Sequence, residues 1–167
     1  MKLGHTLMVA TALIAVAGCA KKPPKELPPA PQETPAAEAP PPAEMGPVPG
    51  SEAHFLANVA SDRVFFDTDK SDIDAPSQAT LRSQAAYLRQ YPNVRVTIEG
   101  HCDERGTREY NLALGERRAN AARQYLIAQG IPASRVKTIS YGKENPDPSG
   151  ADDQAWALNR RAITELQ

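Results

Sequence analysis

The chain has 167 residues, 41% of them hydrophobic and 23% charged, with 19 basic side chains against 20 acidic ones. This length favours one folded domain with appendages, and a net charge of −1 argues against a nucleic-acid-binding protein, which needs a basic surface. Two cysteines, Cys19 and Cys102, are too few for a disulfide framework.

The first 18 residues have the pattern of a bacterial signal peptide. The apolar run over residues 7–16 is shorter than the roughly 20 residues that a membrane-spanning helix needs. It leads into Val-Ala-Gly-Cys at 16–19, which matches the lipoprotein signal, where cleavage precedes a cysteine whose thiol is then diacylated. An ordinary secretory signal with a chance cysteine is the alternative. We predict a lipoprotein signal peptide over residues 1–18 and a lipid anchor on Cys19, and Ala20, where Asp would favour the inner membrane, points to the outer membrane.

Residues 19–50 are predicted to form a disordered tether between this anchor and a folded domain. Eleven of the 16 prolines lie between Pro23 and Pro49, and the apolar residues here are mostly Ala and Pro, which cannot form a core. At about 3.1 Å per residue, some 30 extended residues reach roughly 90 Å. A proline-rich ligand for an aromatic groove is an alternative role for the segment.

Residues 51–167 are predicted to form one α/β (α+β) sandwich, in which two main helices cover one face of a mixed sheet. Alternating apolar residues predict the strands, and apolar residues at helical spacing predict the helices. Because strands alternate with helices along the chain, βαβ crossovers make at least part of the sheet parallel. The expected strands are residues 63–67, 94–98, 135–141 and 161–166, and the expected helices run from Asp74 to Pro92, from Tyr110 to Gln129 and from Ala151 to Asn159.

Charged and polar side chains gather between Glu99 and Ala122. Asp103 would lie just past the end of the second strand, and loop residues in that place often contact ligands in α/β folds. Arg118 lies fifteen residues further on, and a loop that folds back over the helix would bring its guanidinium to Asp103. On physical grounds the pair is either a salt bridge on a solvated surface or a site for a zwitterionic amino acid, with Arg on the carboxylate and Asp on the ammonium.

Several motifs of this domain resemble those of the OmpA-like peptidoglycan-binding family. Residues 98–107, IEGHCDERGT, and residues 110–119, YNLALGERRA, carry the resemblance, and in detail they are similar to the peptidoglycan-associated lipoproteins within that family. The segments VFFDTDKSDI at 64–73, SYGKE at 140–144 and NRRA at 159–162 resemble further parts of it. The resemblance spans about 64–164 and implies an OmpA-like fold with the element order βαβαβ(α)β.

This resemblance implies a domain that binds peptidoglycan non-covalently, at the meso-diaminopimelate of the stem peptide. It implies that Asp103 and Arg118 hold this residue. It also implies that Arg105 and Asp69 line the same site.

Two residues of the expected site depart from the family pattern. Thr68 stands where many members have Phe or Leu, and Cys102 replaces a small residue in a segment whose backbone amides contact the ligand carboxylate. Asn111 is expected to orient the loop through side-chain hydrogen bonds to its backbone. In or near the core we expect Tyr110, Leu114 and Tyr125.

The resemblance also implies three partners: peptidoglycan, the outer membrane through the lipid anchor, and a TolB-like periplasmic protein of the Tol system, which acts in envelope integrity and cell division. The domain would then lie in the periplasm of a Gram-negative bacterium. An envelope lipoprotein that acts mainly through protein partners is the alternative. No enzyme, metal or cofactor is expected, because the sequence lacks HxxxH and CxxC spacings and the adjacent His101 and Cys102 would point apart rather than pair as base and nucleophile.

Overall fold

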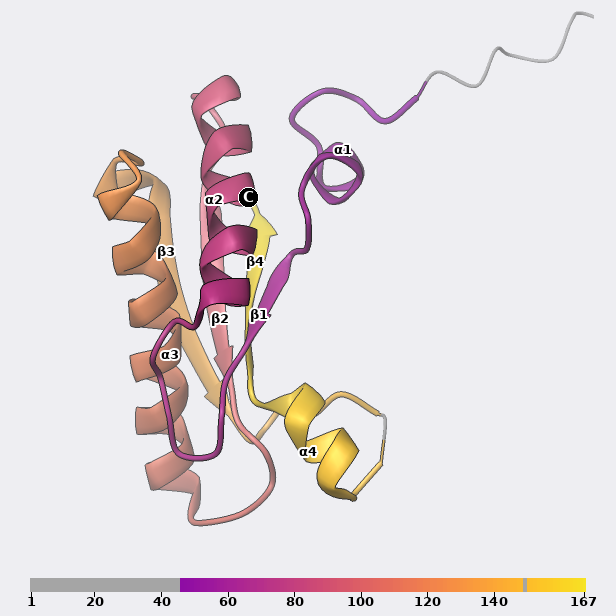
Figure 1. Cartoon of the computed structure of the whole chain (residues 1–167), viewed down its shortest axis with the longest axis vertical. Coiled ribbons are helices and arrows are strands. Elements are labelled where there is room, and N and C mark those ends of the chain that lie inside the picture. The colour runs from indigo at the N-terminus through magenta and orange to yellow at the C-terminus, as the bar shows by residue number, and fades with distance from the viewer. Residues whose placement is uncertain (1–45, 149) are drawn as a thin grey trace, which may run out of the picture. The chain divides into compact units, whose positions relative to one another are not determined.

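A four-stranded sheet organises the part of the chain that the structure describes (Figure 1). The computed structural model describes residues 46–148 and 150–167. The predicted signal peptide, the lipid anchor on Cys19 and most of the predicted tether lie outside the described residues.

Helices and strands follow one another in the predicted order, after one additional helix at the start. None of the helices in the described ranges is long and apolar enough to cross a membrane. The helices are α1 (Glu52–Asn58), α2 (Ala75–Gln90), α3 (Arg108–Ala128) and α4 (Asp153–Asn159), with a short 3-10 helix at Ala133–Arg135. The strands are β1 (Arg63–Phe65), β2 (Val96–His101), β3 (Val136–Gly142) and β4 (Arg161–Leu166).

The sheet is mixed and has the strand order β1-β4-β2-β3. Strands β2 and β3 are parallel, whereas β4 is antiparallel to both of its neighbours, β1 and β2. The last strand of the chain therefore lies inside the sheet, and its first residues come beside the ends of β1 and β2. The predicted mixed sheet with two main helices is confirmed.

Side-chain caps fix where the two long helices begin. The Asp74 carboxylate accepts a hydrogen bond from the amide of Ser77 at 2.8 Å, and Pro76 follows in the first turn of α2. The Thr107 hydroxyl accepts one from the amide of Tyr110 at 3.2 Å at the start of α3. Both helices thus begin directly after the loops that follow β1 and β2.

Most element boundaries differ from the prediction by one to three residues. Strand β1 ends at Phe65, two residues early, and β2 continues to His101 because its pairing with β3 runs on through the residues predicted as a loop. Helix α1 was not predicted, since its seven residues contain one buried side chain, Phe55, and so carry little periodic signal.

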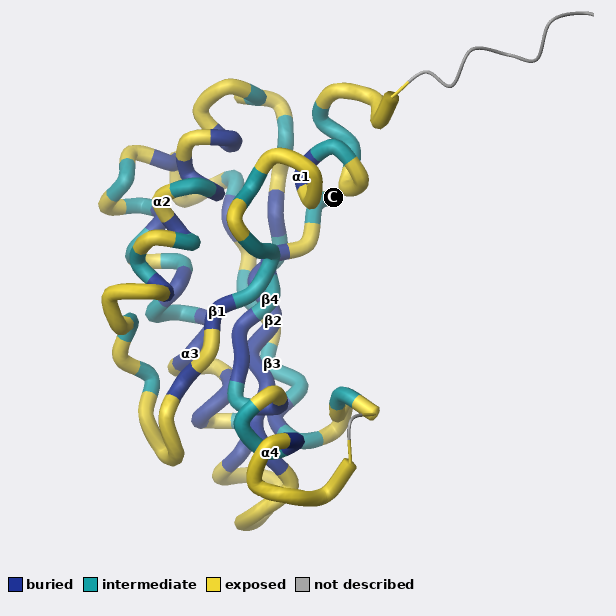
Figure 2. Tube along the Cα trace, turned by 45° about the vertical axis from the view of Figure 1, so that its right-hand side comes forward, coloured by how far each residue is buried: buried dark blue, intermediate teal, exposed yellow. Residues whose placement is uncertain are grey.

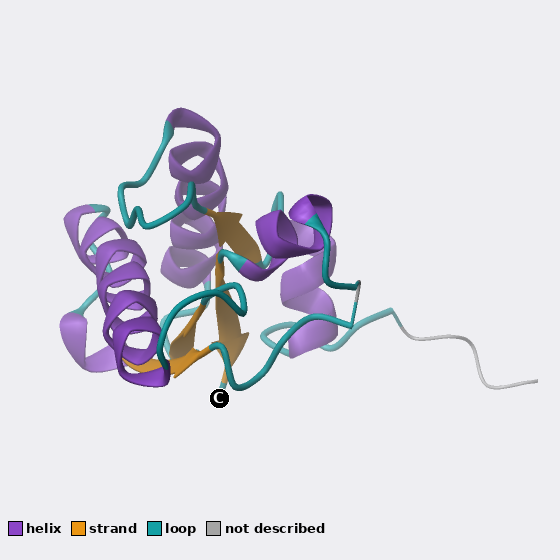
Figure 3. Ribbon diagram, turned by 90° about the horizontal axis from the view of Figure 1, so that it is seen from below, coloured by secondary structure: helices purple, strands orange, loops and turns teal. Residues whose placement is uncertain are grey.

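Helices α2 and α3 lie together on one side of the sheet, as the view along its strands shows (Figure 3). Their apolar sides pack on the strands, and Figure 2 shows the buried strands at the centre with exposed turns outside them. The core includes Val64, Val96, Ile98 and Val136 from the strands and Leu81, Leu88, Ala119 and Leu126 from these two helices.

Two glycines allow α3 to approach β2 closely. Gly100 on β2 faces Gly115 on α3, and a Cβ atom at Gly100 would overlap the carbonyl group of Gly115. Nearby, the Ser140 hydroxyl of β3 donates to the carbonyl of Leu112 at 2.7 Å. The first turns of α3 are therefore held directly against the ends of β2 and β3.

Gly100→Ala is expected to lower the free energy of unfolding by about 1–3 kcal/mol, because the added methyl group meets a backbone carbonyl that cannot turn away. Gly46→Ala is the control, since nothing lies within 4 Å of a Cβ atom there. Urea unfolding followed by circular dichroism measures both variants. An unchanged midpoint for Gly100→Ala would contradict the close contact.

Candidate functional site

Three segments meet at the end of the sheet where β1 and β2 finish, at the bottom of Figure 1. They are the β1–α2 loop, the β2–α3 loop and the junction between α4 and β4. With the first turns of α3 they surround a pocket of about 290 Å³. The pocket is lined by Thr68, Asp69, Cys102, Asp103, Arg105, Gly106, Tyr110, Asn111, Leu114, Arg118 and Arg160.

The fold brings all the sequence-predicted residues of the domain into this one pocket. The six residues predicted to contact a ligand line it, and so does Asn111, which was predicted to support the loop. The lining residues that were not predicted for the site are Gly106, Tyr110, Leu114 and Arg160.

Arg118 is completely buried, and its guanidinium joins the β1–α2 loop to the end of β2. Its Nε donates to the carbonyl of Lys70 at 2.9 Å and its Nη2 to the carbonyl of Asp67 at 3.0 Å. Its Nη1 donates to the carbonyl of His101 at 2.9 Å and to Cys102 Sγ at 3.3 Å. Burial lowers the pKa of Arg118 from its ordinary value, yet an arginine stays protonated at neutral pH. These bonds use four of its five N–H donors.

Asp103 is paired with two other arginines rather than with Arg118. Its Oδ2 accepts from Arg105 Nη2 at 2.6 Å and from Arg160 Nη1 at 3.4 Å, and its Oδ1 accepts from Arg105 Nε at 3.2 Å. Although burial opposes it, these Arg105 hydrogen bonds hold the pKa of Asp103 below its ordinary value. A direct Asp103–Arg118 salt bridge, the alternative to a shared ligand site, is absent from the described contacts, and Asp103 is an ionised carboxylate between two guanidinium groups.

Asn111 and Cys102 fix the backbone of the β2–α3 loop through hydrogen bonds. The Asn111 Nδ2 donates to the carbonyl groups of Arg105 at 2.6 Å and Thr107 at 3.0 Å. The Cys102 amide donates to the carbonyl of Gly142 at 2.7 Å, so this amide is not available to a ligand carboxylate. Burial raises the pKa of the Cys102 thiol, which stays protonated at neutral pH.

The β1–α2 loop contributes the outer wall of the pocket. Asp69 has a left-handed backbone with φ of 58°, uncommon for a residue other than glycine, and its carboxylate accepts from the Tyr110 hydroxyl at 3.3 Å. The Thr68 hydroxyl accepts from Arg105 Nη2 at 3.4 Å. The expectation that Tyr110 lies in or near the core is wrong, because the first turn of α3 extends past the sheet and leaves this ring 44% exposed.

The expectation that Leu114 and Tyr125 lie in or near the core is confirmed. Leu114 is buried and Tyr125 packs against the core.

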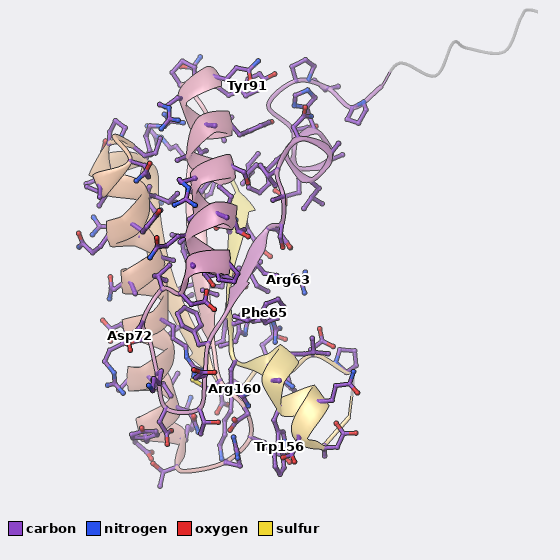
Figure 4. All side chains as sticks on the ribbon, viewed as in Figure 1. Arg63, Phe65, Asp72, Tyr91, Trp156 and Arg160 are labelled. Carbon is purple, nitrogen blue, oxygen red and sulfur yellow. The ribbon has the colours of Figure 1, made fainter. Side chains whose placement is uncertain are left out.

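Helix α4 supports the other side of the β2–α3 loop. The Trp156 indole donates to Glu104 Oε1 at 3.0 Å, and the Arg105 guanidinium lies 4.6 Å from the centre of the Trp156 ring. Figure 4 labels Trp156 and Arg160 on this side of the pocket. Arg160 follows α4 directly, and its Nε donates to the carbonyl of Phe66 at 3.0 Å.

The pocket combines two carboxylates, Asp69 and Asp103, with three guanidinium groups, Arg105, Arg118 and Arg160. Groups of opposite charge on one surface complement a ligand that carries both an ammonium and a carboxylate. The one excess positive charge favours a ligand with a further carboxylate. Within the described residues no group of three or more His, Cys, Asp or Glu side chains is placed to hold a metal ion.

Comparison with known proteins identifies the family to which this chain belongs. The model of the OmpA family matches residues 65–160, a range that contains every lining residue. The chain belongs to the OmpA family. It is similar to the peptidoglycan-associated lipoprotein of Agrobacterium fabrum, with 51% identity over 156 residues that cover 93% of this chain and 84% of the relative. The corresponding protein of Pseudomonas aeruginosa is 38% identical over 161 residues, which cover 96% of this chain and 95% of the relative.

Solved structures agree with the OmpA-family fold. The crystal structure of the peptidoglycan-associated lipoprotein from Burkholderia pseudomallei has a TM-score of 0.63 at 40% identity and covers 68% of this chain and 99% of that chain. The C-terminal domain of Helicobacter pylori MotB has a TM-score of 0.59 at 19% identity, covering 64% of this chain and 84% of that chain, and shares the fold alone. The predicted OmpA-like fold is confirmed.

Arg118→Ala is expected to lower the free energy of unfolding by about 3 kcal/mol or more, because it leaves buried carbonyl groups without donors. Arg117→Ala, an exposed neighbour on the same helix, is the matched control and should change it by less than about 0.5 kcal/mol. Urea unfolding distinguishes them. Equal midpoints for the two variants would contradict the structural role of Arg118.

His101 is completely buried at the end of β2, beside the site. Neither ring nitrogen makes a hydrogen bond to the described residues, and the ring stacks on Tyr141 with centroids 5.6 Å apart. Burial, helped by the positive charge of Arg161, lowers the pKa of His101 to about 4. At neutral pH the ring is therefore neutral, and its 3.4 Å approach to Glu99 is not an ion pair.

His101 is expected to make folding sensitive to mild acid. Its contribution to stability is complete above pH 6.5 and is lost as the pH falls to 4, because the unfolded chain takes up the proton first. This shift corresponds to about 3 kcal/mol. The measurement is the difference in unfolding free energy between the wild type and His101→Phe at each pH in this range, because groups that titrate alike in both proteins cancel in this difference. A difference that does not change with pH would contradict the assignment.

Proposed function

We propose that this chain is a non-enzymatic protein that binds peptidoglycan through the meso-diaminopimelate of the stem peptide. The observation that carries the proposal is the single pocket lined by two carboxylates and three guanidinium groups. Diaminopimelate within a stem presents a free ammonium and a free carboxylate on one carbon, and the pocket offers partners for both. The similarity to proteins named peptidoglycan-associated lipoprotein supports the same polymer.

In this proposal Asp103 takes the ligand ammonium. Arg105 and Arg160 already neutralise this carboxylate in the free protein, so the ammonium replaces part of their contacts and the released guanidinium groups turn to the ligand carboxylate. Arg105 is the more accessible of the two partners, because its side chain is 42% exposed whereas that of Arg160 is 15% exposed. Arg118 offers its one remaining N–H donor and, above all, holds Asp69 and Cys102 in the pocket wall through its bonds to their loops.

The residues that precede the domain would anchor it to a membrane. We propose that residues 1–18 are a lipoprotein signal peptide, that Cys19 carries the lipid, and that residues 19–50 tether the domain 51–167 to the outer membrane. A tether raises the effective concentration of the domain at the wall, and many anchored copies add avidity. The outer membrane is then held to the wall by many reversible contacts.

We further infer a TolB-like periplasmic protein as a second partner, in a Tol system that acts in envelope integrity and cell division. This inference rests on the likeness of the motifs around the pocket to those of the peptidoglycan-associated lipoproteins. A surface that overlaps the pocket would make the two partners exclusive of one another. The domain would then alternate between the wall and the protein.

Asp103→Asn is expected to weaken binding to purified diaminopimelate-type sacculi about tenfold or more, because a neutral amide loses the charge-assisted contact to the ammonium. Asp72→Asn is the control, since Asp72 is an exposed carboxylate of the β1–α2 loop that does not line the pocket (Figure 4). Co-sedimentation over a range of sacculus concentrations measures the affinity of each.

Sacculi whose stems carry lysine in place of diaminopimelate are the second arm, since lysine lacks the carboxylate that the arginines would bind. Equal pelleting with both kinds of sacculi would overturn the diaminopimelate assignment. A folded wild type that stays in the supernatant with both would overturn peptidoglycan binding and leave a protein partner as the principal one.

A further inference from the structure

A trough continues from the site pocket along the edge of the sheet. Arg160 lines both the pocket and a second hollow, and Phe65 and Asp74 of that hollow also line a third one that reaches Arg63. Figure 4 shows the labelled side chains of Arg63, Phe65 and Arg160 following one another from β1 towards α4. The trough is the surface formed by Phe65, Asp67, Asp74, Leu158 and Arg160.

The trough combines apolar and charged side chains. Phe65 is 42% exposed and Leu158 is 38% exposed, and both line the same hollow. Asp67 and Asp74 contribute exposed carboxylates. The Arg160 guanidinium donates from Nε to Phe66 and from Nη1 to Asp103, and its Nη2 makes no hydrogen bond to the described residues.

This combination suits an uncharged occupant with many hydroxyl groups. Carboxylates accept hydrogen bonds from hydroxyls, a guanidinium donates to hydroxyl and amide oxygens, and an aromatic ring beside an aliphatic side chain packs on the apolar face of a sugar. The two carboxylates against one guanidinium disfavour an acidic peptide. The third hollow shares Phe65 and Asp74 with the trough, so a polymer bound in the trough has room to continue along the sheet edge.

We propose that the trough binds the amino-sugar backbone of the same polymer whose stem peptide occupies the pocket, with Phe65 under a sugar ring and Arg160 shared between the two parts of the ligand. The proposal rests on the proposed function, because continuity with the pocket is what identifies the occupant. Its consequence is that the domain recognises a stem together with the sugar that carries it.

The test compares two soluble ligands, the free peptide L-Ala-γ-D-Glu-meso-diaminopimelate and the same peptide attached to its N-acetylglucosamine–N-acetylmuramic acid disaccharide. Titration calorimetry on the full chain in detergent gives both dissociation constants. The wild type is expected to bind the disaccharide form about ten times more tightly. Phe65→Ser removes this preference and leaves the affinity for the free peptide within about twofold.

Ile139→Ser is the matched control, because Ile139 on β3 is equally exposed, at 41%, and lies outside the trough. It should keep the wild-type preference for the disaccharide form. Circular dichroism confirms that each variant is folded.

The outcomes distinguish a failure of the trough proposal from a failure of the proposed function. Equal wild-type affinities for the two ligands overturn the trough proposal and leave the pocket intact, as does a Phe65→Ser variant that keeps the preference. Binding of the disaccharide form alone, lost in Phe65→Ser, supports the trough and contradicts the diaminopimelate pocket. Failure of both ligands to bind the folded wild type overturns the proposed function and the trough together.

Discussion

The buried guanidinium of Arg118 is the interaction on which the site depends. It donates hydrogen bonds to carbonyl groups of the β1–α2 loop and of the end of β2. Strands β1 and β2 are not neighbours in the sheet, so this side chain joins two segments that the sheet does not pair. Burying a charge is costly unless hydrogen bonds compensate for the lost hydration, and four of the five N–H donors of Arg118 are hydrogen-bonded. If the β1–α2 loop moved away, the guanidinium of Arg118 would stay buried without these acceptors. The conformation of the pocket wall is therefore coupled to the stability of the fold.

The strand order provides the second constraint. Because β4 is the last strand in the chain but lies between β1 and β2, its first residues reach the end of β2. Arg160 therefore arrives beside Asp103 from 57 residues away in sequence. The close contact between Gly100 and Gly115 then fixes the height of α3 above the sheet, and with it the positions of Asn111 and Arg118. A pocket with five charged side chains is thereby built on rigid elements rather than on its loops alone.

Sequence reasoning reached the fold and the composition of the site but not its pairing. Helix α2 was predictable because Asp74 and Pro76 mark its start, whereas α1 is too short to show a period. Asp103 and Arg118 were expected to face one another. Their actual partners depend on a turn that lets Arg105 reach back two residues, and on the inner position of β4, which the order of elements along the chain does not specify. The residues of NRRA at 159–162 belonged to the resemblance, but nothing in the sequence placed Arg160 at the pocket.

The contact between Trp156 and the β2–α3 loop has an optical consequence. Trp156 is the single tryptophan of the chain, its indole N–H is bonded to Glu104, and a guanidinium that also holds Asp103 lies over its ring. A cation near an indole ring and a hydrogen bond to its nitrogen both alter the energy of the excited state. The tryptophan fluorescence of this protein therefore originates at the edge of the pocket. It reports a movement of Arg105 without any added label.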